Sequence, residues 1–271
     1  MPTVTVVGIG LGPEDLNKSH REAIQRAEIL VGGKKQLAMF AGQTEDTWTL
    51  GANPKATLEE VREKAGGKRV VILASGDPLF FGIGERALEV FGPEKVTFLP
   101  NLTALQKTFA RLKLPWNQAR ALSVHGREAT EFFAELGHPG PIAIYTDPEN
   151  SPDRLAKLLR EYGMTNRKVA VVEEIGSDKE QCLETDLAEA EEMQFAPVNV
   201  MVLYPEEEQQ PGARLGLEDE LFAKEKSLIT KRESRALILA ELQIKPQGVM
   251  WDVGAGSGSV GIEAVRLAPG L

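Results

Sequence analysis

The stretch Leu73-Ala74-Ser75-Gly76-Asp77-Pro78-Leu79-Phe80-Phe81-Gly82-Ile83-Gly84 connects a buried strand to a loop that can admit a ligand. Residues 70–73 are apolar and rich in β-branched side chains, a pattern typical of a strand covered on both faces. In the loop, Gly76 gives the backbone freedom, Asp77 offers acceptors, and Pro78 lacks a backbone donor. We therefore expect the loop to present carbonyl oxygens, which suit a cationic ligand. An ordinary turn between a strand and a helix is the alternative.

Short apolar runs alternate with amphipathic segments through the first half of the chain, the pattern of a parallel sheet flanked by helices. Helices are expected to begin at a capping box of Ser19 and Glu22, at Thr103, and at Ser151 with the proline that follows it. Pro115 is expected to end the helix that begins at Thr103, and a second αβ series follows from Ala121 on. The sequence thus predicts an α/β fold, with strands at 4–7, 29–31, 70–73, 142–145, 169–172 and 198–203.

The composition limits the classes of partner. The formal net charge of -9 argues against a broad nucleic-acid surface, because phosphate binding needs clustered Lys and Arg. A polyanionic substrate would need a local basic cleft. The single cysteine, Cys182, allows neither an internal disulfide nor a multi-thiolate metal site, and we expect it to be a small buried side chain. No apolar run approaches the ~18 residues that span a bilayer, and no basic segment precedes the first strand, so we expect a cytoplasmic protein without a membrane span.

A linker divides the chain unequally. Residues 205–212 are polar, acidic and bounded by prolines, which is typical of a solvated connection between domains. After it, helices are expected at 231–242 and 260–267, with a strand at 249–253 between them. The linker therefore separates residues 1–205 from a second region that begins near residue 221.

Gly8-Ile9-Gly10-Leu11-Gly12 follows the first strand, and together with the Gly76-Asp77-Pro78 loop it resembles the tetrapyrrole methylase family. This resemblance covers about residues 3–204. It implies two αβ halves, at about 1–114 and 117–205, with the active site in the cleft between them, and a homodimer. Three further blocks look like those of one branch of the family, the precorrin-6Y C5,15-methyltransferases of cobalamin synthesis: Pro100-Asn101-Leu102-Thr103-Ala104, Arg111-Leu112-Lys113-Leu114-Pro115-Trp116 and Leu122-Ser123-Val124-His125-Gly126-Arg127.

The stretch Trp251-Asp252-Val253-Gly254-Ala255-Gly256-Ser257-Gly258 resembles the first motif of a class I methyltransferase that uses S-adenosylmethionine (SAM). The same branch fuses such a module behind its tetrapyrrole methylase module. The resemblance therefore implies a linker at 206–220 and an incomplete, Rossmann-like N-terminal fragment of a class I domain at 221–271. The acidic residue that would hold the SAM ribose belongs to the next strand, so we expect no activity from this fragment.

The Gly-Asp-Pro loop of the family holds SAM, and the resemblance implies a cofactor site made by three loops. Thr103, in one of them, has a second interpretation as a plain helix N-cap, and one side chain could serve both roles. A dinucleotide site after the first strand is disfavoured, because Pro13 stands where the third glycine of that fingerprint is needed. The implied SAM-binding residues are Gly76, Asp77, Pro78, Phe81, Ile83, Thr103, Ala104, Tyr145 and Thr146.

Substrate contacts are implied for Gly10 and Gly12, where small residues let a flat substrate approach the backbone, and for His125 and Arg127. A corrinoid precursor carries acetate and propionate carboxylates, which a planar guanidinium binds in a bidentate manner. A surface arginine and a hydrogen-bonded loop histidine are the alternative. Further candidate cations, for each of which a solvated side chain is the favoured interpretation, are Lys34, Lys35 and Arg111.

Glu173 and Glu174 follow an expected strand and could transfer a proton, although carboxylates at strand ends are usually solvated. The catalytic residue stays unassigned, and no metal site is predicted. Together with the resemblance, the sequence predicts a SAM-dependent methyltransferase that methylates C5 of a small-molecule corrin precursor of the precorrin-6Y or precorrin-7 type, with neither nucleic acid nor membrane as partner. The alternatives are the same step on a cobalt-precorrin, another activity of this fold on ribosomal RNA or on a modified histidine of elongation factor, and a non-catalytic binder.

Overall fold

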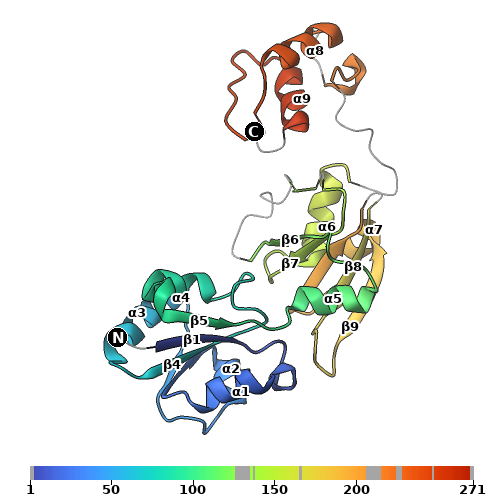
Figure 1. Ribbon diagram of the computed structural model, residues 1–271. Coiled ribbons are helices and arrows are strands. Elements are labelled where there is room, and N and C mark those ends of the chain that lie inside the picture. The colour runs from blue at the N-terminus through green and yellow to red at the C-terminus, as the bar shows by residue number, and fades with distance from the viewer. Residues whose placement is uncertain are drawn as a thin grey trace.

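The computed structural model describes residues 3–125, 135–136, 138–164, 167–205, 215–223, 228–245 and 247–268. Two five-stranded sheets, each with its own helices, organise the part of the chain before the linker (Figure 1). The α/β fold expected from the sequence is confirmed. Among the described residues no helix is both long and apolar enough to cross a membrane.

The first half folds into a parallel sheet with the strand order β3-β2-β4-β1-β5. Because all its strands run in one direction, the carboxyl ends of the three neighbours β4, β1 and β5 lie along one edge of the sheet. The elements of this half are β1 (Thr3–Gly8), η1 (Pro13–Asp15), α1 (Lys18–Gln25), β2 (Ile29–Gly32), α2 (Lys34–Met39), β3 (Thr47–Thr49), α3 (Pro54–Lys64), β4 (Arg69–Ala74), α4 (Gly84–Phe91), η2 (Pro93–Lys95), β5 (Val96–Leu99) and α5 (Ala104–Leu112).

The second half contains a mixed sheet with the order β6-β7-β10-β8-β9. β6 and β7 are parallel, whereas β10 runs antiparallel to both of its neighbours and β8 pairs antiparallel with β9. The elements of this half are β6 (Arg120–Ser123), β7 (Ile142–Tyr145), α6 (Pro152–Glu161), β8 (Lys168–Glu173), β9 (Gln181–Asp186), α7 (Leu187–Glu191) and β10 (Asn199–Leu203).

β4 is covered on both faces, as its apolar run predicts. Successive side chains of a strand point to opposite faces. Val70 and Ile72 accordingly pack in the cluster that contains the buried residues of α3 and α4, while Val71 and Leu73 pack with Ile24 of α1. Two separate cores thus hold the central strand in place, and the loop that follows it begins from a fixed point.

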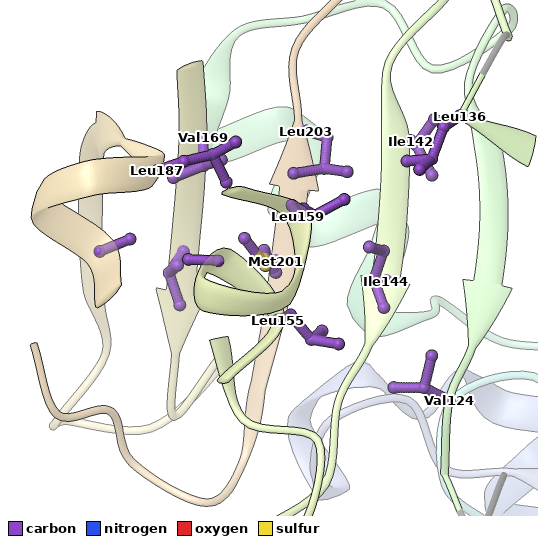
Figure 2. Packing of buried hydrophobic residues seen from close by; sticks show 13 residues of the cluster. Val124, Leu136, Ile142, Ile144, Leu155, Leu159, Val169, Leu187, Met201 and Leu203 are labelled. Atoms are coloured by element: carbon purple, nitrogen blue, oxygen red, sulfur yellow. The ribbon is translucent and has the colours of Figure 1, made fainter. Parts of the chain in front are cut away.

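In the second half, α6 supplies an apolar stripe to one face of the sheet (Figure 2). Leu155 and Leu159 lie one turn apart on this helix and are fully buried. They pack with side chains of the strands below, which include Ile144 of β7 and Met201 of β10. The proline after Ser151 starts the helix where the sequence predicts it, since Pro152 is its first residue.

α5 belongs to the first half in sequence but packs on the second sheet. Its apolar face, which includes Leu105 and Phe109, is buried against Ala143, Val172 and Val200. These strand residues alternate with those under α6, so α5 covers the opposite face of the second sheet. This core therefore consists of α5 and the second sheet, and Phe80 from the loop after β4 packs against it.

The capping box expected at Ser19 and Glu22 is wrong by two residues. Asn17 caps α1 instead, because its Oδ1 accepts from the His20 amide (3.1 Å) while His20 Nδ1 accepts from the Asn17 amide (3.2 Å). His20 is buried, and its Nε2 donates to the Pro100 carbonyl (3.1 Å). A buried histidine with both ring nitrogens engaged thus fixes the start of α1 against the loop after β5.

After the linker, the described residues contain η4 (Asp219–Leu221), α8 (Arg232–Glu241) and α9 (Ser259–Leu267). Both helices lie where the sequence predicts them. The strand expected at 249–253 is wrong: no strand forms there, and Val249, Trp251 and Val253 are largely exposed. A strand needs a neighbour that takes its backbone hydrogen bonds. None of the described strands pairs with this segment.

Phe109→Ala is expected to lower the free energy of unfolding by ~3 to 5 kcal/mol, because it removes a fully buried ring from the core between α5 and the second sheet. Phe109→Leu keeps most of the apolar volume and should cost about 1 kcal/mol. Urea unfolding followed by circular dichroism measures both values. Equal stability of Phe109→Ala and the unaltered chain would contradict this view of α5.

Candidate active site

Three loops meet at the carboxyl edge of the first sheet, where they follow β1, β4 and β5. The Ile9 amide donates to the Ala74 carbonyl (2.9 Å), and the Gly76 amide donates to the Gly10 carbonyl (2.8 Å). Gly10 and Gly76 form an isolated antiparallel bridge just past the parallel ladder. The loops after β1 and β4 are therefore physically joined. In open α/β sheets this edge is the usual position of a ligand site.

The backbones of these loops approach one another too closely for side chains. A Cβ on Gly8 would lie 2.6 Å from the Gly76 carbonyl oxygen and 3.0 Å from atoms of Asn101 and Pro78. Gly76 has a φ of +61°, and a Cβ there would lie 3.5 Å from Thr103 Cα. Asn101 holds the third loop in the same cluster, because its side-chain amide donates to the Gly8 carbonyl (2.9 Å). Glycine at position 8 is thus a requirement of the site.

The Gly-Asp-Pro turn closes on itself. Asp77 Oδ1 accepts from the Leu79 amide (2.8 Å), and the Asp77 carbonyl accepts from the Phe80 amide (3.3 Å). The Pro78 carbonyl accepts from the Gly84 amide (2.9 Å). The expectation that this loop presents its carbonyl oxygens is therefore wrong for Asp77 and Pro78, whose oxygens bind the loop's own amides. The turn presents apolar side chains instead, since Leu79 is exposed.

Phe81 carries an unusual backbone conformation in the loop between β4 and α4. Its φ is +52°, in a region that residues other than glycine rarely adopt. Its ring lies 4.8 Å from that of Phe80 and 5.7 Å from that of Tyr145, measured between centroids. Because Tyr145 ends β7, this aromatic cluster connects the two halves, and such contacts sustain a strained backbone. Ile83, by contrast, packs against the core of the first half.

Thr103 and Tyr145 meet at the N-terminus of α5. Thr103 Oγ1 accepts from the Gln106 amide (3.1 Å), and Gln106 Oε1 accepts from the Thr103 amide (2.8 Å), so Thr103 is an N-cap. The Tyr145 hydroxyl accepts from the Leu105 amide (2.9 Å) and hydrogen-bonds the Thr103 side chain. Burial raises the pKa of Tyr145, while the hydrogen bonds to Leu105 and Thr103 oppose that rise. A neutral phenol therefore links the second half to the start of α5.

Thr146 and Ala104 lie beside this contact. Thr146 is buried and its hydroxyl donates to Asn199 Oδ1 (2.6 Å), while Asn199 Nδ2 donates to the Ala196 carbonyl (2.7 Å). These bonds tie the end of β7 to the start of β10. Ala104 packs against the core between α5 and the second sheet. Both residues thus have structural contacts next to the position where Tyr145 meets Thr103.

Gly10 and Gly12 lie on either side of Leu11 in the loop after β1. The Leu11 amide donates to Asp15 Oδ2 (2.9 Å). The Leu11 side chain contacts the turn after β8, where a Cβ on Gly176 would lie 2.8 Å from Leu11 Cβ. The glycine-rich loop of the first half therefore contacts the turn after β8 of the second half.

The remaining predicted substrate residues are not gathered at this point. His125 is exposed beyond the end of β6, and its amide has a long contact to Ser123 Oγ (3.4 Å). Arg127 lies outside the described residues. Lys34 and Lys35 are exposed at the start of α2. Of the predicted set, the structure brings Gly10 and Gly12 to the joined loops.

The sequence also singles out the acids Glu173 and Glu174 and the thiol Cys182. A carboxylate oxygen of Glu173 accepts from the Ala196 amide, so this acid holds the loop before β10. Glu174 has a φ of +46° and its amide donates to the Val198 carbonyl (2.9 Å). Cys182 is exposed rather than buried, because β9 is an edge strand. In the described ranges no group of three or more His, Cys, Asp or Glu side chains could hold a metal ion.

Sequence reasoning missed Asn101 and His20, which position the loop after β5. Both hold backbone carbonyls across a long sequence separation, Asn101 at Gly8 and His20 at Pro100. A signal for His20 exists, because it stands four residues before Ile24 on the buried face of α1. A polar side chain on an apolar face indicates a specific partner.

Comparison with known proteins places this geometry in a family. A family model described as Tetrapyrrole (Corrin/Porphyrin) Methylases matches residues 3–191, which include all three loops. The chain is a member of the tetrapyrrole methylase family. A second family model, described as Precorrin methyltransferase domain, matches residues 220–271. The order of the two matches agrees with the order of the two resemblances seen in the sequence.

Relatives of this tetrapyrrole methylase differ in how much of the chain they match. Precorrin-6Y C(5,15)-methyltransferase [decarboxylating] from Sinorhizobium sp is 33% identical over 99% of this chain and 66% of that protein. Cobalt-precorrin-7 C(5)-methyltransferase from Salmonella typhimurium is 35% identical over 66% of this chain and 88% of that protein. The crystal structure of uroporphyrin-III C-methyl transferase from Thermus thermophilus, complexed with S-adenosylhomocysteine, has a TM-score of 0.60 at 22% identity, covering 74% of this chain and 91% of that one. This chain spans about two thirds of the length of its precorrin-6Y relative.

Tyr145→Phe is expected to lower the free energy of unfolding of this tetrapyrrole methylase by ~1 to 3 kcal/mol, because the Leu105 amide loses its acceptor in a partly buried position. Tyr162→Phe is the matched control: Tyr162 is exposed at the end of α6, so its loss of a hydroxyl should cost less than that of Tyr145. Chemical unfolding measures the free energy of unfolding of both variants. Equal effects of the two substitutions would contradict the role given to Tyr145.

Proposed function

We propose that this tetrapyrrole methylase uses SAM to methylate C5 of a precorrin of the precorrin-6Y or precorrin-7 type in cobalamin biosynthesis. The observation that carries the proposal is the likeness to precorrin-6Y C(5,15)-methyltransferase over 99% of the chain. The Salmonella relative, named for C5 methylation, matches 66% of the chain. Because the tetrapyrrole methylase model matches residues 3–191, we assign C5 methylation to residues 1–205.

The residues at the joined loops fit SAM. They offer the Asp77 carboxylate, the Thr103 hydroxyl and the rings of Phe81 and Tyr145. Residues 8–16, 74–85, 100–106 and 143–151 contain neither Lys nor Arg. A donor set with a carboxylate and no cation suits the sulfonium and ammonium groups of SAM. The Thermus relative with the same fold, solved with S-adenosylhomocysteine, supports this assignment.

When bound, SAM supplies a methyl group on a positively charged sulfur. The residues of the chain then have to hold donor and acceptor in line, and positioning of this kind can contribute ~7 to 11 kcal/mol to lowering a barrier. The loops are suited to this task because they are fixed in advance. Hydrogen bonds join Gly76 to Gly10, Asn101 to Gly8, and Tyr145 to the start of α5.

For the substrate, we propose that Gly10 and Gly12 face the flat macrocycle and that His125 and Arg127 contact its carboxylates. The loop that carries Gly10 and Gly12 is joined to Gly76 and contacts the turn after β8, which supports a position next to SAM. A second candidate substrate is the cobalt-containing precorrin. The 35% identity to cobalt-precorrin-7 C(5)-methyltransferase favours it.

The test is mass spectrometry of the products formed from SAM and either a metal-free or a cobalt-loaded precorrin, with carbon-13 NMR to locate the new methyl group. One methyl group at C5 is the expected result. A chain that ends at residue 205 should react at the same rate, because all four clusters of buried hydrophobic residues in the described structure lie before the linker. Methylation at another carbon, or loss of C5 methylation in the shorter chain, would contradict the proposal.

Asp77→Ala tests the contribution of the Asp77 carboxylate to SAM binding. Asp153→Ala, which removes a carboxylate from the first turn of α6, is the matched control. A charge-assisted hydrogen bond is worth ~1.5 to 3 kcal/mol, so Asp77→Ala should weaken SAM binding by about 10-fold or more in titration calorimetry. Asp153→Ala should leave it unchanged.

A further inference from the structure

One face of α5 leads away from the joined loops. Thr103, Lys107 and Arg111 are spaced by four residues and so lie along the same side of the helix, with Thr103 beside Gly76 at its start. Eight residues of helix span about 12 Å. This face is therefore a short path from the proposed SAM loops toward the second half.

A groove of about 520 Å³ lies along the far end of this face, between α5 and the turn after β8. Its volume falls in the range of ligand sites, about 300 to 1,000 Å³. The groove adjoins the glycine-rich loop, because Gly176 on its wall contacts Leu11. It is lined by Lys107, Ala110, Arg111, Gly176, Ser177, Asp178 and Glu180.

Lys107 is held at the groove by Asp15. One carboxylate oxygen of Asp15 accepts from the Leu11 amide (2.9 Å), and the other pairs with Lys107 Nζ (3.2 Å). The Asp15 side chain is 11% exposed, whereas that of Lys107 is 31% exposed. The acid is thus engaged in fixing the glycine-rich loop, while the ammonium group reaches the groove.

Arg111 is held in the same way from the opposite wall. One oxygen of Glu180 accepts from the Gly176 amide (2.8 Å), and the other pairs with Arg111 Nε. The Glu180 side chain is 13% exposed and that of Arg111 is 62% exposed. Because the ion pair uses Nε, the two terminal amino groups still form a fork that can bind a second carboxylate end-on.

We propose that Lys107 and Arg111 form a subsite for one acid side chain of the macrocycle. The inference rests on the proposed function, since it needs a substrate that carries carboxylates. The methyl acceptor carbon has to lie near the joined loops, and a carboxylate at the edge of the same ring would then reach the groove. Asp178 stands on the other wall and repels an anion, whereas the charge of Glu180 on that wall is already paired with Arg111. Asp178 therefore favours a carboxylate on the side of α5.

The test is titration calorimetry with two corrinoid probes. Cobyrinic acid carries free carboxylates, whereas cobinamide carries amides in their place. Arg111→Gln should weaken cobyrinic acid binding by about 10-fold, the effect of one charge-assisted contact, and flatten its dependence on salt. The affinities for cobinamide and for S-adenosylhomocysteine should stay unchanged. Arg111→Lys keeps the charge but loses the forked pair of amino groups. Its affinity for cobyrinic acid should lie between that of the unaltered chain and that of Arg111→Gln.

Arg86→Gln is the matched control, because Arg86 is an exposed arginine of α4 in an ion pair with Glu89 (2.8 Å), away from the groove. It should bind both probes as the unaltered chain does. Unchanged binding of cobyrinic acid by Arg111→Gln, or equal losses for cobyrinic acid, cobinamide and S-adenosylhomocysteine, would overturn the subsite. If the unaltered chain binds S-adenosylhomocysteine but neither corrinoid, the proposed substrate fails and the subsite fails with it.

Discussion

The contact between two loop backbones at Gly8 and Gly76 is the constraint on which the rest of the structure depends. The Gly76 carbonyl oxygen occupies the space that a Cβ at position 8 would need, and the Gly76 amide is bonded to the Gly10 carbonyl. This arrangement fixes the loop after β4 against Thr103 and thereby the start of α5. Because α5 then packs on the second sheet through Phe109, the same contact sets the position of one half relative to the other. A methyl transfer that needs two reactants in line benefits from such a frame.

Around these joined loops, side chains of both halves make contacts of a similar kind. Tyr145 binds the amide of Leu105 from the second sheet, and its ring contacts that of Phe81 from the first half. Asp15 and Glu180 each use one oxygen for a loop amide and the other for a cation of α5. Each contact therefore joins a loop to α5 or one half to the other. The proposed SAM site and the proposed carboxylate subsite are two ends of the same helix face.

The sequence predicts what local patterns determine and misses what distant partners determine. The apolar run before Gly76 and the Thr103 cap are settled by their own neighbours in the chain, and the structure confirms both. The cap of α1 depends on a buried His20 that reaches Pro100. The Pro78 carbonyl turns inward because Gly84, six residues away, supplies the donor. A strand at 249–253 needs a neighbouring strand, which no pattern within the segment can provide.

The most direct test of this account is a crystal structure of the chain with S-adenosylhomocysteine. We expect the ligand to lie against the loop that contains Gly76 and Asp77, with Tyr145 and Thr103 within contact distance, about 4 Å. Binding at the glycine-rich segment 254–258 in place of these loops would contradict it. So would a ligand held by the first half alone, with no contact to Tyr145, because the account makes the site a joint product of both halves.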